Sequence, residues 1–205
     1  MLAGKFIVFE GIDGAGKTTQ MQLLAEFLHN NDIPVLCTRE PGGTQIGGRL
    51  REVLLDRSCH NMSHRTEAFL YAADRAQHVA EIVRPALNSG VTVLCDRFIY
   101  STVAYQGWGR GMEIALLQQI NELATDGLLP DAVVLLDIPV LVGLRRVLKH
   151  RSPDRLEVEQ QAFFQRVREG YLEQAARLPK IFRVLRGDGA VEMVHRNILK
   201  TLSDL

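Results

Sequence analysis

The sequence lacks the features that mark several classes of protein. Its 205 residues include 24 basic and 24 acidic side chains, so the formal net charge is zero. Because no excess of one sign favours nucleic acid or an anionic membrane surface, we expect neither as a partner. The longest apolar stretch, 132–144, is interrupted by Asp137 and Pro139 and is too short to form a transmembrane helix.

Cysteine is also scarce, and its few positions do not suggest a disulfide framework. Cys37, Cys59 and Cys95 are an odd number without the spacing of metal ligands. Cys37 and Cys95 lie in apolar runs, where we expect buried thiols. The six histidines show no metal-binding pattern, and we expect them to be structural or exposed. With the first apolar run ending at Glu10, too early for a signal peptide, these features favour a cytoplasmic protein.

Glycine, in contrast, is concentrated in a segment near the N-terminus, 6–22, with the sequence FIVFEGIDGAGKTTQMQ. An apolar run is followed by Gly-x-x-x-x-Gly-Lys-Thr, with its fixed positions at Gly11, Gly16, Lys17 and Thr18, and then by a helical pattern. Backbone N–H groups of such a loop surround phosphates, the lysine reaches the outer phosphates and the threonine hydroxyl binds Mg²⁺. The segment therefore predicts binding of a nucleoside triphosphate.

Five short apolar runs predict the strands of a sheet, at 6–9, 33–37, 91–95, 132–136 and 181–185. Helical patterns lie between them, which is typical of repeated β-α units in an α/β fold. Such units form a parallel sheet with helices on both faces. No internal repeat or linker-like segment divides the chain, so we expect one domain.

Two intervals are longer than a single crossover helix needs. The first, 44–90, has room for a helix at 47–55, a loop at 58–61 and a long helix at 65–88. The second, 96–131, contains a predicted glycine-rich loop at 106–111 and a helix at 112–126. Extra segments on a compact sheet commonly cover a binding site.

Charged residues follow each predicted strand. They are Glu10 and Asp13, Arg39, Asp96 and Arg97, Asp137, and Asp188. Because ligands of open parallel sheets bind outside the carboxyl ends of the strands, these groups predict a phosphate and Mg²⁺ site. Asp137 and Asp188 could instead cap helices.

Two further patterns allow more than one interpretation. Tyr71 and Arg75 lie one helical turn apart, where they could hold a nucleobase or form an ordinary cation–π pair on the surface. A basic run at 145–155 surrounds Ser152 and Pro153. It could be a solvated helix face or part of a lid, near 145–157, over the transferred phosphates.

Three segments resemble the signature sequences of bacterial thymidylate kinases. They are FEGIDGAGKTTQ at 9–20, TREPGGT at 38–44, and 96–107, which begins DRF and ends AYQG; YAADR at 71–75 lies between them. The resemblance covers essentially the whole chain. It implies a nucleoside monophosphate kinase domain spanning 1–205, with the three-layer P-loop NTPase fold, five parallel strands in the order 2-3-1-4-5 and a homodimeric assembly.

The resemblance also implies site residues. The ATP loop would consist of Gly11, Ile12, Asp13, Gly14, Ala15, Gly16, Lys17 and Thr18, with Mg²⁺ near Thr18 and Asp96. The dTMP site would consist of Asp13, Arg39, Pro41, Arg51, Tyr71, Arg75, Arg97, Ser101, Thr102, Tyr105 and Gln106.

Individual roles within the dTMP site follow from the same resemblance. Arg39 and Arg97 would hold the phosphate, and Tyr71 would stack on thymine. Arg75 and Thr102 would bond the base edge. Two further expectations are that Tyr105 crowds the place of a ribose 2′-hydroxyl and that the Glu40–Pro41 peptide bond is cis.

The expected catalytic residues are Lys17, Arg97 and Arg151. Since the phosphate loop contains no internal arginine, the resemblance assigns the further positive charge to the lid. Arg146, Lys149 and Arg155 are alternatives to Arg151 in that role.

The implied reaction is Mg²⁺-dependent transfer of the ATP γ-phosphoryl group to dTMP, giving dTDP and ADP for dTTP synthesis. We expect dUMP to be a weaker acceptor. The rival interpretations are a kinase of deoxynucleosides, with Glu10 or Asp13 as the base, a kinase of another nucleoside monophosphate, and a P-loop switch or ATPase. A phosphate acceptor needs no protein base because its second pKa is about 6, and the arginines favour an anionic acceptor.

Overall fold

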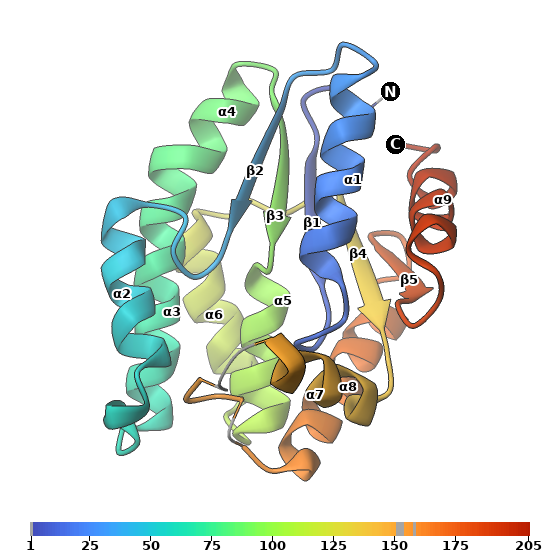
Figure 1. Cartoon of the computed structure of the whole chain (residues 1–205). Helices are drawn as coiled ribbons and strands as arrows, with labels where there is room; N and C mark the ends of the chain where they lie inside the picture. Colours follow the sequence, from blue (N-terminus) through green and yellow to red (C-terminus); the bar gives the residue numbers. More distant parts are fainter. Residues whose placement is uncertain (1, 151–153, 158) are drawn as a thin grey trace.

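A computed structural model describes residues 2–150, 154–157 and 159–205. At its centre lies a parallel sheet of five strands in the order β2-β3-β1-β4-β5, which confirms the expected topology (Figure 1). The strands are β1 (Phe6–Glu10), β2 (Val35–Arg39), β3 (Thr92–Asp96), β4 (Ala132–Asp137) and β5 (Phe182–Arg186).

Helices pack on both faces of this sheet. The first two crossovers contain α1 (Lys17–His29), α2 (Gln45–Leu55), the short η1 (Arg57–Cys59), α3 (His64–His78), η2 (Val79–Val83) and α4 (Arg84–Asn88). The remaining helical segments are α5 (Ile99–Thr102), η3 (Val103–Gly109), α6 (Ile114–Thr125), α7 (Val140–His150), α8 (Gln161–Arg177) and α9 (Val191–Thr201). Within the described ranges, no helix is both long and apolar enough to cross a membrane.

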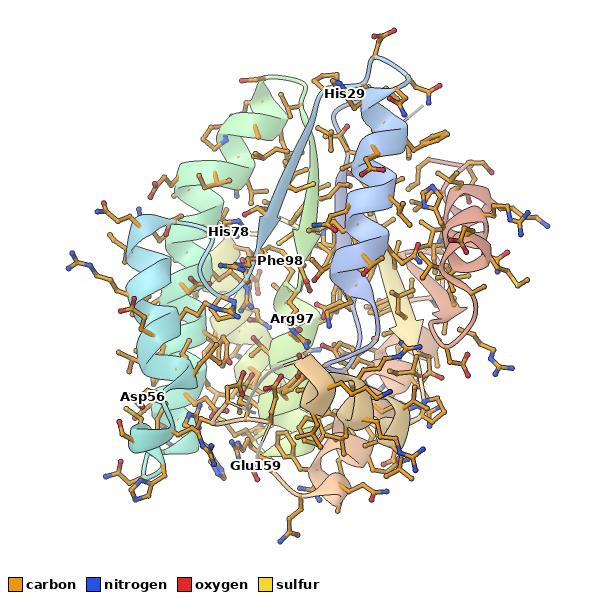
Figure 2. The ribbon with its side chains drawn as sticks, viewed as in Figure 1. His29, Asp56, His78, Arg97, Phe98 and Glu159 are labelled. Atoms are coloured by element: carbon orange, nitrogen blue, oxygen red, sulfur yellow. The ribbon has the colours of Figure 1, made fainter. Side chains whose placement is uncertain are left out.

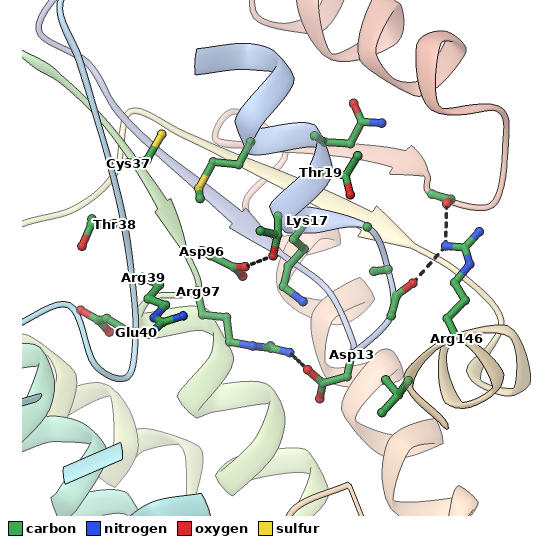
Figure 3. Close-up of a pocket in the computed structure, with 18 of the residues that line it drawn as sticks. Asp13, Lys17, Thr19, Cys37, Thr38, Arg39, Glu40, Asp96, Arg97 and Arg146 are labelled. Atoms are coloured by element: carbon green, nitrogen blue, oxygen red, sulfur yellow. Dashed lines mark hydrogen bonds and ion pairs between the residues drawn. The ribbon is translucent and has the colours of Figure 1, made fainter. Parts of the chain in front are cut away.

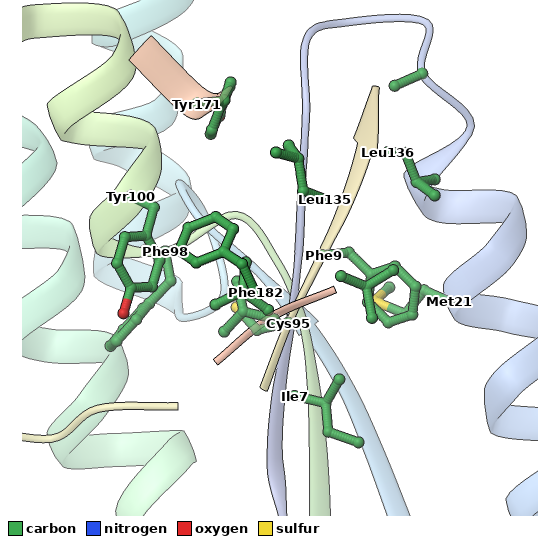
Figure 4. Packing of buried hydrophobic residues seen from close by; sticks show 14 of the residues in the cluster. Ile7, Phe9, Met21, Cys95, Phe98, Tyr100, Leu135, Leu136, Tyr171 and Phe182 are labelled. Carbon is green, nitrogen blue, oxygen red and sulfur yellow. The ribbon is translucent and has the colours of Figure 1, made fainter. Parts of the chain in front are cut away.

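The hydrophobic core occupies both sides of the three central strands. Phe9 of β1 and Met21 of α1 lie on one side, and Phe98, Tyr100 and Tyr171 lie on the other (Figure 4). β1 is buried along its whole length, as are β3 and β4 up to their last residue. Continuous apolar runs are typical of strands covered on both faces, which explains why these three were recognisable in the sequence.

Of the five strands, the edge strand β2 differs most from the prediction. β2 begins and ends two residues later than expected, and β5 one residue later, because both mix polar and apolar residues. The prediction of a buried thiol is also wrong for one cysteine, because its strand lies at the edge of the sheet. Cys95 in β3 is buried as expected, whereas Cys37 in β2 is exposed.

The predicted glycine-rich loop at 106–111 is wrong over most of its length. Residues up to Gly109 form η3, a π-helical segment that continues from α5. A Cβ atom at Gly109 would lie 2.6 Å from Cε2 of Phe163 on α8, so this glycine permits close helix packing. The long helix expected at 65–88 is present as α3, η2 and α4, with a π-helical segment in its middle.

Parallel pairing places the carboxyl ends of the strands at one edge. Asp96 pairs in register with Phe9 on one side and with Arg39 on the other. The loops that follow β1, β2 and β3 therefore meet at this edge, where the phosphate loop leads into α1.

Candidate functional site

A cavity of about 950 Å³ lies at the carboxyl edge of the sheet and is lined by the phosphate loop (Figure 3). Close packing requires glycine within this loop. Gly11 has φ +137°, and a Cβ atom there would lie 2.5 Å from the carbonyl oxygen of Leu136. A Cβ atom at Gly14, where φ is +76°, would lie 2.5 Å from the carbonyl oxygen of Gly143. The backbone of the loop is thus pressed against β4 and α7.

Lys17 places its ammonium group inside the loop. The side chain is buried, and Nζ donates to the carbonyl oxygens of Gly11 at 3.1 Å and Ile12 at 3.2 Å. Burial and the positive charge of Arg97 lower the pKa of Lys17, whereas the carboxylates of Asp96 and Asp13 raise it. The loop and this cation together form a site for an anion such as a triphosphate.

Thr18 and Asp96 provide oxygen ligands beside the loop. The Thr18 hydroxyl donates to Oδ2 of Asp96 at 2.9 Å. The other oxygen, Oδ1, is buried and has no hydrogen-bond partner among the described residues. Mg²⁺ prefers oxygen ligands and commonly takes one or two carboxylates together with nucleotide phosphates and water. These two side chains fit such an ion.

Arg97 lies beside Asp13 of the phosphate loop. Its Nη2 donates to Asp13 at 2.8 Å and to the Tyr105 hydroxyl at 3.0 Å, and its Nη1 donates to the hydroxyls of Ser101 and Tyr171. Burial opposes ionisation of Asp13, but the charges of Arg97 and Lys17 outweigh it and lower the pKa of Asp13 to about 2. The Asp13–Arg97 ion pair therefore persists at neutral pH.

A second, smaller cavity of about 90 Å³ adjoins the first. Both cavities are lined by Asp13, Glu40, Arg51 and Arg97, so they form two parts of one site. Of the predicted dTMP-binding residues, the smaller cavity is lined by Asp13, Pro41, Arg51, Tyr71, Arg75, Arg97, Ser101, Thr102, Tyr105 and Gln106. Arg39 lines only the larger cavity. The Glu40–Pro41 peptide bond is cis, as expected.

Arg75 is buried, which excludes the surface cation–π pair with Tyr71 as an explanation of their spacing. Its Nε donates to Glu40 at 2.9 Å, and Nη1 donates to Thr102 at 3.1 Å and to Asn121 at 2.7 Å. Its guanidinium carbon lies 5.5 Å from the centre of the Phe98 ring. The guanidinium group is therefore held rigidly behind the smaller cavity.

The described histidines differ in their positions. His78 is buried, and its Nδ1 lies 2.8 Å from Glu40 and its Nε2 lies 2.7 Å from the Thr38 hydroxyl. His29, in contrast, lies at the end of α1 remote from Arg97 (Figure 2). In the part of the chain that the structure describes, no cluster of three or more His, Cys, Asp and Glu residues could hold a metal ion.

The sequence did not predict that Tyr171 contacts two site residues, Glu10 and Arg97. Glu10 accepts hydrogen bonds from the backbone N–H groups of Phe98 and Ser101 and from the hydroxyls of Ser101 and Tyr171. Burial raises the pKa of Glu10 despite these bonds and the charge of Arg97. Tyr171 comes from α8, and no sequence motif marks it.

Asp137 and Asp188 lie at the expected edge of the sheet but do not line either cavity. Asp137 accepts two hydrogen bonds from Arg168 of α8, at 2.6 and 2.8 Å. Asp188 pairs with Arg186 on the surface. Both carboxylates therefore have arginine partners outside the two cavities.

The four candidates for the catalytic cation of the lid lie in different parts of the chain. Arg151 lies outside the described residues. Arg146 lines the larger cavity and donates to the carbonyl oxygens of Gly14 and Gly187. Lys149 is exposed on α7. Arg155 is buried and bonds α2 and α3, so its guanidinium group lies away from the phosphate loop.

Known proteins resemble this chain over nearly its whole length. Residues 9–198 match the sequence model of the family described as thymidylate kinase. A thymidylate kinase of Pelotomaculum thermopropionicum is 49% identical over 205 residues, which cover 100% of this chain and 95% of the relative. One of Desulforudis audaxviator is 54% identical over 188 residues, covering 91% and 85%.

A solved structure agrees with these relatives. The crystal structure of a thymidylate kinase from Ehrlichia chaffeensis aligns with a TM-score of 0.81 at 33% identity, covering 97% of this chain and 98% of that one. Members of this family are kinases, which transfer phosphoryl groups. Sequence and fold together place the protein in the thymidylate kinase family.

Proposed function

We propose that this kinase transfers the γ-phosphoryl group of ATP to dTMP, giving ADP and dTDP in the synthesis of dTTP. The observation that carries the proposal is the joined pair of cavities. One is lined by the phosphate loop, the other is lined by the predicted dTMP-binding side chains except Arg39, and Asp13 and Arg97 belong to both. Such an arrangement brings two nucleotides together at their phosphates.

On the donor side, the ATP phosphates would lie along the loop from Gly11 to Thr18, with Lys17 beside the outer phosphates. Thr18 and Asp96 would hold Mg²⁺, which neutralises phosphate charge when bound. Arg146, at the rim of the larger cavity, adds a further positive charge near Gly14. A lid near 145–157, with Arg151 as its catalytic cation, completes this side of the proposal.

On the acceptor side, Arg39, Arg51 and Arg97 would hold the dTMP phosphate. Tyr71 would stack on thymine, and Arg75 and Thr102 would bond the base edge. The Tyr105 hydroxyl, 3.0 Å from both Arg97 and Asp13, would leave no room for a ribose 2′-hydroxyl. dUMP has the same base edge without the methyl group and would be a weaker acceptor.

Phosphoryl transfer at this site depends on alignment and charge. The acceptor phosphate is largely ionised near neutral pH, so no protein base is needed. Positioned cations, here Lys17 and Arg97, stabilise charge on the transferred group. Glu10 is an unsuitable base for a nucleoside hydroxyl, because four donors already bond its carboxylate and it does not line either cavity.

A coupled assay of ADP release across a panel of acceptors tests the proposal. We expect release to be fastest with dTMP, slower with dUMP and near background with dAMP, dGMP and thymidine. A Lys17→Ala variant serves as the inactive control. Equal rates with purine monophosphates would indicate a broader nucleotide kinase. ADP release that is independent of any acceptor would indicate an ATPase instead.

We also infer a homodimer in a reducing compartment such as the cytoplasm. The apolar side chains of Ile46, Val53 and Phe69 are exposed on α2 and α3, which pack against each other. Large exposed apolar groups on neighbouring elements favour burial in an interface. Free thiols at Cys37, Cys59 and Cys95 support the choice of compartment.

A further inference from the structure

Four charged side chains form a cluster outside both nucleotide cavities. We call this cluster, Glu67, Arg110, Arg155 and Glu159, the clasp. Nη2 of Arg155 donates to Glu67 at 2.6 Å, Arg110 contacts Glu67 at 3.4 Å, and Arg110 also pairs with Glu159. The clasp therefore joins α3 and the residue after η3 to the chain segment between α7 and α8.

The clasp is charge-balanced and largely buried. The side chains of Glu67 and Arg155 are 1% and 7% exposed. Burial opposes ionisation of Glu67, but a hydrogen bond from Gln106 and the charges of Arg110 and Arg155 lower its pKa. Removing one partner of a buried ion pair is costly because the other charge remains uncompensated. The ion pair between Glu67 of α3 and Arg155 should therefore persist.

Arg155 holds its own backbone against the end of α2. Its N–H donates to the carbonyl oxygen of Leu55 at 3.3 Å, and its Nε donates to that of Leu54 at 2.8 Å. Together with the bond to Glu67, these contacts fix residues 154–157 relative to two helices. Glu159, beyond the same segment, is attached through Arg110, whose guanidinium carbon lies 4.9 Å from the centre of the Phe163 ring.

The fixed segment forms part of both cavity walls. Asp154 and Leu156 line the smaller cavity, and Glu157 lines the larger one. Leu55 and Gln106, which the clasp also contacts, line the smaller cavity too. No clasp residue lines either cavity. A shift of the segment would nevertheless change the wall of the smaller cavity through two residues and the wall of the larger cavity through one.

We propose that the clasp positions segment 154–157 as the outer wall of the acceptor site, with Arg155 as a positioning residue acting through that segment. The inference rests on the proposed function, because it takes the monophosphate acceptor to be dTMP. In this proposal Arg155 is not one of the cations that contact the transferred phosphoryl group. Arg155 acts on acceptor binding through Leu156 and Asp154, and contributes no charge to the reacting atoms.

The test compares Arg155→Met with Arg155→Lys and with a matched control, Arg177→Met. Arg177 forms an exposed ion pair with Glu173 on α8, so its loss should change nothing. For Arg155→Met we expect the KM for dTMP to rise about tenfold or more, the KM for ATP to change less than about twofold, and kcat to change less than KM. Arg155→Lys, which keeps the charge, should restore part of the affinity.

Hydrogen exchange measured by mass spectrometry provides a readout that needs no substrate. The amides of Leu156 and Glu157 are bonded to Asp154, and that of Arg155 to Leu55. In nucleotide-free protein, Arg155→Met should accelerate exchange across 154–157, and Arg177→Met should not. If Arg155→Met fails to fold, the double variant Glu67→Gln with Arg155→Met keeps Arg110 paired with Glu159 and should show the same changes.

Two results would overturn the clasp proposal. One is unchanged exchange and unchanged KM for dTMP in a folded Arg155→Met protein. The other is a fall in kcat of a hundredfold or more with KM unaltered, which is the effect expected of a residue that contacts the transferred group. A wild-type protein without dTMP-dependent ADP release would contradict the proposed function instead, and hydrogen exchange would then decide on the clasp alone.

Discussion

Asp74 is a buried carboxyl group next in sequence to Arg75, which lines the smaller cavity. Its Oδ1 accepts a hydrogen bond from the Gly42 N–H at 2.9 Å, and its Oδ2 is buried without a hydrogen-bond partner among the described residues. Burial and the negative charge of Glu40 raise the pKa of Asp74 to about 6, although Arg75 and His78 oppose the shift. The folded protein therefore binds a proton here more tightly than the unfolded chain does.

This shift predicts how pH affects stability. An unfolded Asp titrates near 3.9. The stabilisation that comes from the raised pKa of Asp74 is therefore complete below about pH 4 and is lost as pH rises through about 6, which lowers the free energy of unfolding by up to about 3 kcal/mol. Asn at this position does not titrate. The free energy of unfolding of Asp74→Asn, relative to wild type, should therefore increase between pH 4 and pH 7 in urea titrations. A difference that stays constant with pH would contradict the raised pKa.

Arg97 makes a sharper prediction for activity. Its two terminal nitrogens donate in four directions, to Asp13, Ser101, Tyr105 and Tyr171, which a single ammonium group cannot reproduce. Arg97→Lys should lower kcat/KM for dTMP about a hundredfold or more, measured by coupled ADP release. The control is Arg186→Lys, at an exposed position outside both cavities. Near-normal turnover by Arg97→Lys would show that a point charge is sufficient.

Some of these residues could be predicted from the sequence and others could not. The phosphate loop and the charges after β1, β2 and β3 were predictable, because short motifs and parallel pairing determine their positions. Tyr171 was not, since an isolated tyrosine in an amphipathic helix is usually part of the core. Its contact with Arg97 depends on how α8 packs across the sheet edge, which no local pattern encodes.

At the scale of elements, the contact between α8 and η3 depends on glycine. A Cβ atom at Gly170 would lie 2.5 Å from Cγ of Trp108, and Gly109 shows a similar close approach to Phe163. The sequence analysis interpreted Gly109 as part of a loop and did not single out Gly170. A glycine selected for helix packing cannot be distinguished locally from one selected for a turn, which explains why η3 was missed while the central strands were predicted correctly.

The packing argument predicts different effects for two glycine substitutions within helices. Gly170→Ala should lower the free energy of unfolding by about 1–3 kcal/mol, because the added methyl group overlaps the Trp108 ring. Gly48→Ala in α2 has no atom within 4 Å of its new Cβ and should stabilise the protein by up to about 1 kcal/mol. Denaturant titrations of both variants give the comparison. Equal effects would mean that helix propensity, and not contact with Trp108, controls position 170.

At the scale of the whole molecule, the site is assembled from loops at one edge while apolar surface remains on the side helices. Leu116 and Leu123 are exposed on α6, which packs against α3, and Phe69 is exposed on α3. These side chains are spread over the helices α2, α3 and α6, on the opposite side of the molecule from α9 (Figure 1). Sequence patterns alone did not reveal this surface, because exposure depends on which helix faces the sheet covers.

The proposed homodimer predicts a specific effect of charge on this surface. Phe69 is 53% exposed, and Phe69→Glu would place a carboxylate in an apolar interface without a partner. Sedimentation velocity at micromolar concentration should show a dimer for wild type and a monomer for Phe69→Glu. Met193→Glu on α9, where the side chain is also 53% exposed, is the matched control and should remain dimeric. A dimer that survives Phe69→Glu but dissociates with Met193→Glu would place the interface on the other side of the sheet.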